Sequence, residues 1–115
     1  MSCKIKTINV FDRQAHKLAK HYASFRDDLK EFIKELRNNP EMGTDLGSGV
    51  RKVRMSITSK GKGKSGGARV ITYNIEKKSE DEILITLMTI YDKSEISNVS
   101  DAYLRSLVSQ IKNQK

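Results

Sequence analysis

The sequence predicts a single α+β domain, residues 1–115, in which a four-stranded, mainly antiparallel sheet carries its helices on one face. Three observations lead to this prediction. A chain of 115 residues has the size of one domain. Four segments have the apolar alternation or β-branched composition of strands, and three others repeat apolar residues at helical spacing. Their order is β-α-α-β-β-β-α, so three consecutive strands form an antiparallel meander that the first strand joins.

The first third of the chain predicts one strand and two helices. Residues 4–10 alternate polar and apolar side chains and predict a strand. Asp12 is expected to cap a helix that begins at Arg13, and Ser24 to cap a second helix that ends before Pro40. The apolar stripes of the two helices are Ala15, Leu18, Ala19 and Tyr22, and then Phe25, Leu29, Phe32, Ile33 and Leu36. Two tandem helices of this kind predict an αα-hairpin.

The remainder of the chain predicts three strands and a last helix. The expected segments are a loop at 41–49, strands at 50–58, 68–75 and 82–91, a glycine-rich link at 59–67, a polar turn at 76–81 and a connection at 92–99. The strand at 82–91 is apolar on both faces, which predicts a place inside the sheet. Ser100 is expected to cap the last helix. The buried face of that helix is predicted to contain Tyr103, Leu104, Leu107, Val108 and Ile111.

Composition limits what else the chain contains. No apolar run is long enough to cross a bilayer, and the N-terminus lacks the apolar core of a signal peptide. Cys3 is the one cysteine, so no internal disulfide is possible, and a cytoplasmic location is expected. His16 and His21 stand about 140° apart around a helix, which is poor geometry for a shared metal. No metal site and no cofactor are predicted.

Positive charge is concentrated in one segment. Seven Lys and Arg residues and no acids lie between Gly49 and Tyr73, in a chain of net charge +8. The seven are Arg51, Lys52, Arg54, Lys60, Lys62, Lys64 and Arg69. A solvated hairpin whose lysines keep the protein soluble is the simplest interpretation, but soluble surfaces usually mix both signs of charge. The segment therefore predicts an anion-binding face, and nucleic acid is the most abundant extended anion in a cell.

The spacing of the charged residues predicts how they would meet. Lys52 and Arg54 share a face of their strand, and Arg69 begins the neighbouring strand at the loop end of a hairpin. Tyr91 and Lys93 emerge where the next strand leaves the sheet, beside Arg69. Surrounding cations are expected to lower the pKa of Tyr91 by favouring its phenolate. A nucleotide-triphosphate loop is not favoured, because the helix that must follow such a loop is replaced by a strand.

Two blocks carry a resemblance to a known family. Residues 62–73 (KGKSGGARVITY) and 90–95 (IYDKSE) resemble the RelE superfamily of type II toxins, in particular its HigB-like branch. Residues 39–43 and 51–54 are similar to further elements of that family. The resemblance covers almost the whole chain. It implies the RelE-like fold and an mRNA endonuclease that acts in the ribosomal A site, contacts rRNA and is held inactive by a cognate antitoxin.

The resemblance also implies roles for particular residues. The catalytic set would be Lys52, Arg54, Arg69, Tyr91 and Lys93. The basic segment with its glycine-rich loop separately predicts an RNA-binding set of Arg51, Lys60, Lys62 and Lys64. The family's C-terminal tyrosine has no secure counterpart in this chain unless Tyr91 takes that role, so the general base stays open. Two alternatives also stay open: a gyrase-inhibiting toxin of the ParE type, which shares the fold, and a noncatalytic basic RNA-binding module.

Overall fold

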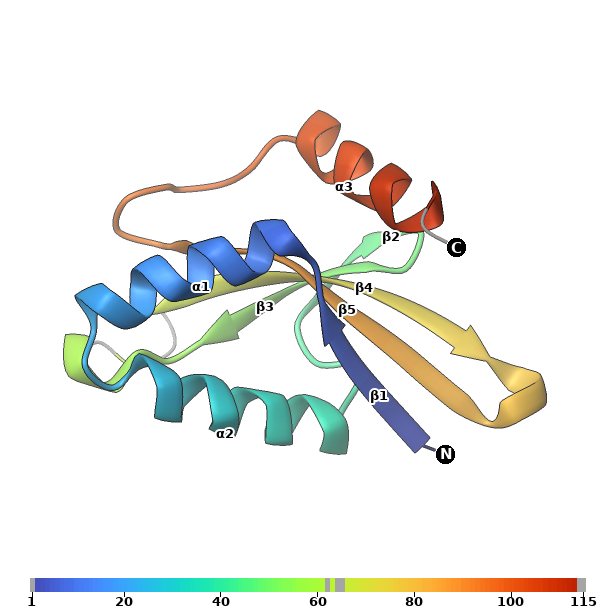
Figure 1. Ribbon diagram of the computed structural model, residues 1–115, viewed down its shortest axis with the longest axis horizontal. Helices are drawn as coiled ribbons and strands as arrows, with labels where there is room; N and C mark the ends of the chain where they lie inside the picture. The colour runs from blue at the N-terminus through green and yellow to red at the C-terminus, as the bar shows by residue number, and fades with distance from the viewer. Residues whose placement is uncertain (1, 62, 64–65, 114–115) are drawn as a thin grey trace.

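The computed structural model describes residues 2–61, 63 and 66–113 and has the predicted α+β architecture. The strands are β1 (Ser2–Thr7), β2 (Thr44–Gly47), β3 (Val50–Met55), β4 (Ala68–Lys77) and β5 (Glu82–Asp92). The helices are α1 (Asn9–His21), α2 (Phe25–Asn38) and α3 (Asp101–Asn113). The strands form one sheet in the order β1-β5-β4-β3-β2 (Figure 1).

The order of the strands confirms most of the predicted meander. Strands β3, β4 and β5 are antiparallel neighbours, and β1 joins the sheet beside β5 as a parallel strand. Strand β5 is paired on both sides, as its continuous apolar sequence predicts. Beyond the end of β1, Gln14 of α1 accepts hydrogen bonds from the Ile90 amide and the Thr89 hydroxyl, each at 2.9 Å. Helix α1 thereby provides a hydrogen-bond acceptor for the part of β5 that extends beyond its pairing with β1.

The sheet has five strands, one more than predicted. Strand β2 lies within the segment predicted as a loop and pairs with β3 across a turn. Gly47, Ser48 and Gly49 all have positive φ in that turn, which suits glycine. All four residues of β2 are exposed. A strand exposed on both faces has no apolar alternation, so the sequence carries no signal for it.

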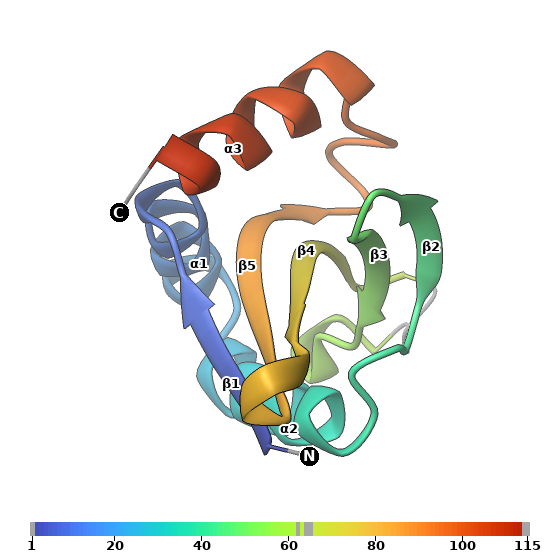
Figure 2. The ribbon, with the colours of Figure 1, turned by 90° about the vertical axis from the view of Figure 1, so that its right-hand side faces the viewer.

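The helices cover both faces of the sheet, which corrects the prediction of helices on one face. Helices α1 and α2 pack on one face, in a cluster that includes Phe11, Phe25, Phe32, Leu36, Val53, Met55, Val70, Leu87 and Ile90. Helix α3 packs on the opposite face, in a second cluster that includes Val50, Ile71, Tyr73, Met88, Tyr91, Leu104, Leu107 and Ile111. Figure 2 shows α3 and α2 on opposite sides of the strands. Helical periodicity reveals an apolar stripe but not the sheet face that it covers.

Two of the three predicted caps differ from expectation. Helix α1 begins at Asn9 and places Phe11 in the core. Asp12 therefore falls in the first turn, where a carboxylate interacts favourably with the helix dipole. Ser24 occupies the N-cap position of α2, but its hydroxyl bonds Asp28 and Ser59 instead of a helix amide. Ser100 caps α3 as predicted, since its Oγ accepts the Tyr103 amide at 3.1 Å. No helix in the described part of the chain could span a membrane.

Candidate nucleic-acid interface

Three predicted site residues form a row across three strands on the α3 face. Arg54 lies directly opposite Arg69 in the β3–β4 pair, and Arg69 lies directly opposite Tyr91 in the β4–β5 pair. Directly opposite residues point to the same side of a sheet, with Cβ atoms about 4.5–5.5 Å apart. Lys52 stands two residues before Arg54 and so shares that side. These four residues are called the basic row below.

The basic row concentrates positive charge without acids between the cations. Like charges directly opposite each other destabilise a sheet, yet Arg54 and Arg69 are paired in this way. Among the described residues, no carboxylate lies within ion-pair distance of Lys52 or Arg54. The Lys52 ammonium contacts the Asn98 carbonyl oxygen at 3.5 Å, and buried Arg69 donates to the Ala68 carbonyl at 3.2 Å. An anion lying between the two arginines would relieve their repulsion.

Tyr91 is buried in the α3 cluster, and its ionisation differs from the prediction. Burial raises the pKa of its phenol, and the opposing effect of the Arg69 charge is smaller. The expectation of a stabilised phenolate is therefore wrong, because loss of hydration outweighs the nearby cation. The hydroxyl is buried and makes no hydrogen bond to any described residue. Tyr91 is a neutral phenol with a proton to donate, not a ready base.

A glycine holds the strands of the basic row close together. A Cβ placed on Gly67 would lie 2.1 Å from the Met55 carbonyl oxygen, far inside contact distance. Gly67 also accepts the Lys93 amide at 3.1 Å, which continues the strand pairing past the end of β5. A side chain at this position, two residues before Arg69, would push β3 and β4 apart beside the Arg54–Arg69 pair. Lys93 itself is exposed directly beyond β5.

The Lys60 side chain is buried, although the sequence predicts it on an exposed glycine-rich link. Its residue belongs to a short 3-10 helix (Thr58–Lys60), and its ammonium pairs with the Asp92 carboxylate at 2.5 Å. The side chains of Lys60 and Asp92 are only 7% and 1% exposed. The ammonium also stands 5.6 Å from the centre of the Tyr22 ring, in cation–π geometry. The ammonium of Lys60 is therefore turned into the fold, where it pairs with a carboxylate, and not toward the open surface.

Asp92 and Tyr22 were not among the predicted site residues. The Tyr22 hydroxyl donates to Asp92, as do the hydroxyl and amide of Ser94. Burial alone would raise the pKa of Asp92, but the hydrogen bonds from Lys60, Tyr22 and Ser94 hold it well below its usual range. The same bond to Asp92 raises the pKa of Tyr22 to about 12. The sequence carries one signal for Asp92, which is a carboxylate that directly follows the apolar end of β5, Ile90 and Tyr91.

Of the other predicted RNA-binding residues, the structure describes Arg51 alone. Arg51 donates to the carbonyl oxygens of Glu41, Met42 and Gly43 and lies 3.9 Å from Asp45. It therefore fastens the segment before β2, on the opposite side of β3 from Lys52 and Arg54. Lys62 and Lys64 lie outside the described residues. Of the nine predicted site residues, the structure brings Lys52, Arg54, Arg69 and Tyr91 together and places Lys93 just past the end of their strands.

The fold and the basic row together define a small α+β protein with cations gathered on one face of its sheet. A sequence model of the family described as "RelE toxin of RelE / RelB toxin-antitoxin system" matches residues 8–114. The match spans nearly the whole chain, from the start of α1 to the end of α3. The chain therefore belongs to the RelE toxin family and is the toxin of a toxin-antitoxin system, which implies a cognate antitoxin.

Proposed function

We propose that this toxin, from the HigB-like branch of its family, is an endoribonuclease that cleaves mRNA on the ribosome. The observation that carries the proposal is the basic row, which joins three cations and a neutral phenol on one face without a described carboxylate partner for Lys52 or Arg54. Such a face suits a phosphodiester and the additional negative charge that it gains during cleavage. Family membership supports the same chemistry.

The proposed reaction is attack by a 2′-hydroxyl on the adjacent phosphorus. A base removes the hydroxyl proton, the P–O5′ bond breaks, and the leaving 5′-oxygen takes a proton. Arg54 and Arg69 hold the phosphate oxygens and stabilise the charge that develops there. Tyr91 is the proposed proton donor to the leaving oxygen, because burial keeps its phenol protonated. Its hydroxyl is buried, so it reaches RNA only after the surrounding side chains shift.

The base is the weak part of this site. The basic row contains no histidine and no carboxylate, and Tyr91 is held neutral. Lys52 is the first candidate to accept the proton, and exposed Lys93 the second. A site with strong phosphate stabilisation and a weak base depends on how the substrate is positioned. Such a dependence is expected if the ribosomal A site positions the mRNA. Cations near the basic row would then contact rRNA.

Arg54→Gln is the substitution that tests the proposal, because Arg54 is exposed and the folded chain should tolerate its loss. Wild-type protein should arrest growth and cut translated mRNA, as mapped by primer extension. With purified ribosomes at saturation, Arg54→Gln should lower the cleavage rate by about 10²–10³-fold, typical for loss of one transition-state donor. Arg26→Gln, on the exposed side of α2, is the matched control and should leave the rate unchanged.

Other results would overturn the proposal in specific ways. Intact mRNA together with accumulated gyrase–DNA complexes would identify a gyrase-inhibiting toxin. RNA binding without cleavage and without growth arrest would identify a noncatalytic RNA-binding module. Equal cleavage rates for wild type and Arg54→Gln would remove the basic row from the reaction.

A further inference from the structure

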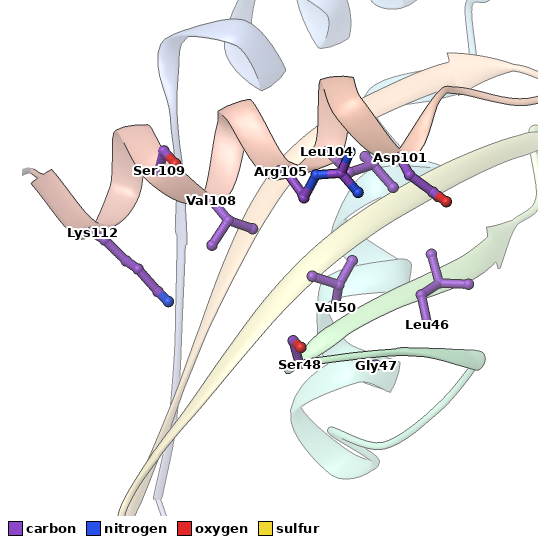
Figure 3. A pocket seen from close by; sticks show the side chains of 10 residues that line it. All are labelled: Leu46, Gly47, Ser48, Val50, Asp101, Leu104, Arg105, Val108, Ser109 and Lys112. Carbon is purple, nitrogen blue, oxygen red and sulfur yellow. The ribbon is translucent and has the colours of Figure 1, made fainter.

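Helix α3 lies between two cavities. The first is a groove of about 450 Å³ beside Leu46, between α3 and the β2–β3 hairpin, and Figure 3 shows Arg105 in its lining. The second, of about 540 Å³, lies between α3 and α1 and is lined by Tyr103. Tyr103 and Arg105 stand about 160° apart around the helix, so the cavities use opposite sides of it. The volume of the second cavity is within the range of about 300–1,000 Å³ that is typical of small-molecule sites.

The α1 wall of this second cavity is basic. Its residues follow at i, i+3, i+4 and i+7, so they share one side of the helix, and they are Val10, Arg13, Gln14 and Lys17. Arg13 and Lys17 are exposed, repel each other across one turn and have no ion-pair partner among the described residues. Asp12, the one acidic residue of α1, lies on the opposite side of the helix. An anion held between Arg13 and Lys17 would therefore relieve their repulsion.

Gln14 adds a fixed hydrogen-bond donor to the same wall. Its Oε1 accepts from the Thr89 hydroxyl and the Ile90 amide, each at 2.9 Å. The Ile90 amide can only donate, so these bonds fix which atom of the Gln14 side chain faces β5. Its Nε2 makes no hydrogen bond to a described residue and is left as a donor at the cavity. A donor in this place can bind an acceptor atom at the edge of a nucleic-acid base.

Tyr103 provides the opposite wall, from the first turn of α3. Its side chain is half-buried and packs beside the cluster that holds α3 on the sheet. Proteins bind single-stranded nucleic acid with this combination of an accessible aromatic ring and nearby cations, because the ring stacks on a base while the cations hold the phosphate. A run of carboxylates on a peptide would pair with the cations but would not stack on the ring.

We propose that this cavity binds one nucleotide. The base stacks on Tyr103 and accepts a hydrogen bond from the Gln14 Nε2, and the phosphate lies between Arg13 and Lys17. Two sources supply this chemistry, an RNA strand and a free nucleotide. Nucleotide binding rests on the cavity, whereas RNA as the source rests on the proposed function.

The location of the cavity favours RNA as the source. Thr89, which donates to Gln14, stands two residues before Tyr91 on the same face of β5, about 7 Å along the strand. An RNA strand whose scissile phosphate lies on the basic row would therefore bring a neighbouring nucleotide to the cavity. The cavity would then hold the strand in place beside the reacting bond.

Calorimetry with adenosine 5′-monophosphate and with ribose 5-phosphate tests the base-binding wall. Wild-type protein should bind the nucleotide at least about fivefold more tightly than the sugar phosphate, because only the nucleotide has a base to stack. Tyr103→Leu keeps an apolar side chain and should abolish that preference. Tyr103→Phe keeps the ring and should retain it. Circular dichroism should confirm that both variants are folded.

Arg13→Gln together with Lys17→Gln tests the phosphate-binding wall. This pair should raise the Kd for adenosine 5′-monophosphate at least about fivefold and should weaken its dependence on salt. The matched control is Arg26→Gln with Lys30→Gln, which removes two exposed cations at the same spacing from α2. The control should stay within about twofold of wild type.

A fluorescently labelled RNA hexamer with 2′-O-methyl riboses separates the two sources, because the proposed reaction cannot cut it. If RNA is the source, the hexamer should bind at least about tenfold more tightly than adenosine 5′-monophosphate, and Tyr103→Leu should weaken its binding. Equal affinities for the hexamer and the mononucleotide would identify a free nucleotide as the ligand.

Four results would overturn the inference. They are equal affinities of wild type for the nucleotide and the sugar phosphate, equal nucleotide binding by Tyr103→Leu and Tyr103→Phe, an α1 pair that binds as the α2 control does, and binding of hexaglutamate in place of both nucleotide probes. Cleavage of ribosome-bound mRNA is measured in parallel. Cleavage without nucleotide binding at the cavity would overturn this inference alone, and nucleotide binding without cleavage would overturn the proposed function alone.

Discussion

Near the end of β5, the two faces of the sheet differ in how their charged and polar groups are paired. On the α1/α2 face, buried Asp92 pairs with Lys60 and accepts from Tyr22. On the α3 face, one residue earlier along β5, buried Tyr91 has a hydroxyl with no hydrogen bond to any described residue, beside two arginines placed opposite each other. The polar groups around Asp92 are satisfied, whereas the basic row sets two like charges opposite each other and leaves a buried hydroxyl without a described partner. Unfavourable arrangements of this kind persist where function requires them.

The largest effect should come from breaking the satisfied ion pair. Lys60→Met leaves the buried Asp92 carboxylate without its cation, so the free energy of unfolding should fall by about 3–5 kcal/mol. Lys34→Met is the control, since the Lys34–Glu31 pair is 73% and 70% exposed and should contribute less than about 0.5 kcal/mol. Chemical denaturation measures both. Equal decreases in the free energy of unfolding of the two variants would mean that the Lys60–Asp92 pair contributes no more than an exposed one.

The next largest change in the free energy of unfolding is expected at Tyr22, and Tyr91 on the opposite face of the sheet provides the comparison. Tyr22→Phe removes a hydrogen bond to a carboxylate and should lower the free energy of unfolding by about 1.5–3 kcal/mol. Tyr91→Phe removes a buried hydroxyl without a described partner, so it should be neutral or stabilise the fold by up to about 1 kcal/mol. Thermal and denaturant unfolding measure the two changes. A Tyr91→Phe protein that loses as much stability as Tyr22→Phe would show that its hydroxyl is bonded.

The effect of Tyr22→Phe should depend on alkaline pH. The pKa of Tyr22 is raised to about 12 in the folded protein, against about 10 when unfolded. A raised folded pKa gives stability that is fully present below pH 10 and is lost as pH rises toward 12. The stability difference between wild type and Tyr22→Phe should therefore shrink as the pH rises from about 10 to about 12. A difference that stays constant over this range would mean that Tyr22 titrates normally.

The smallest effect should come from relieving repulsion in the basic row. Arg54→Gln removes one of two opposed like charges and should raise the free energy of unfolding by about 0.2–1 kcal/mol at low salt. The gain should fade as salt screens the pair. Arg26→Gln, away from the row, should show neither the gain nor the salt dependence. A loss of stability in Arg54→Gln would mean that the arginine is held by favourable contacts.

Local patterns in the sequence were sufficient to predict the basic row. The two-residue spacing put Lys52 and Arg54 on one face, and the hairpin put Arg69 at its loop end. The observed register agrees and sets Arg69 directly opposite Arg54. The same patterns were insufficient for Lys60, because its partner Asp92 is 32 residues away in the chain. They also predicted the wrong direction for the pKa of Tyr91, because that pKa depends on how completely α3 and its neighbours exclude water.

The sequence by itself determined the α+β class, the order of its main elements and the concentration of cations on adjacent strands, because these follow from short-range periodicity and hairpin geometry. The tertiary structure alone decided the fifth strand, the face that α3 covers, the pairing of Lys60 with Asp92 and the groove beside Leu46. Each of these depends on which distant segments come together in space. Burial then decides whether a given lysine or tyrosine is charged and free to act, or fixed within the fold.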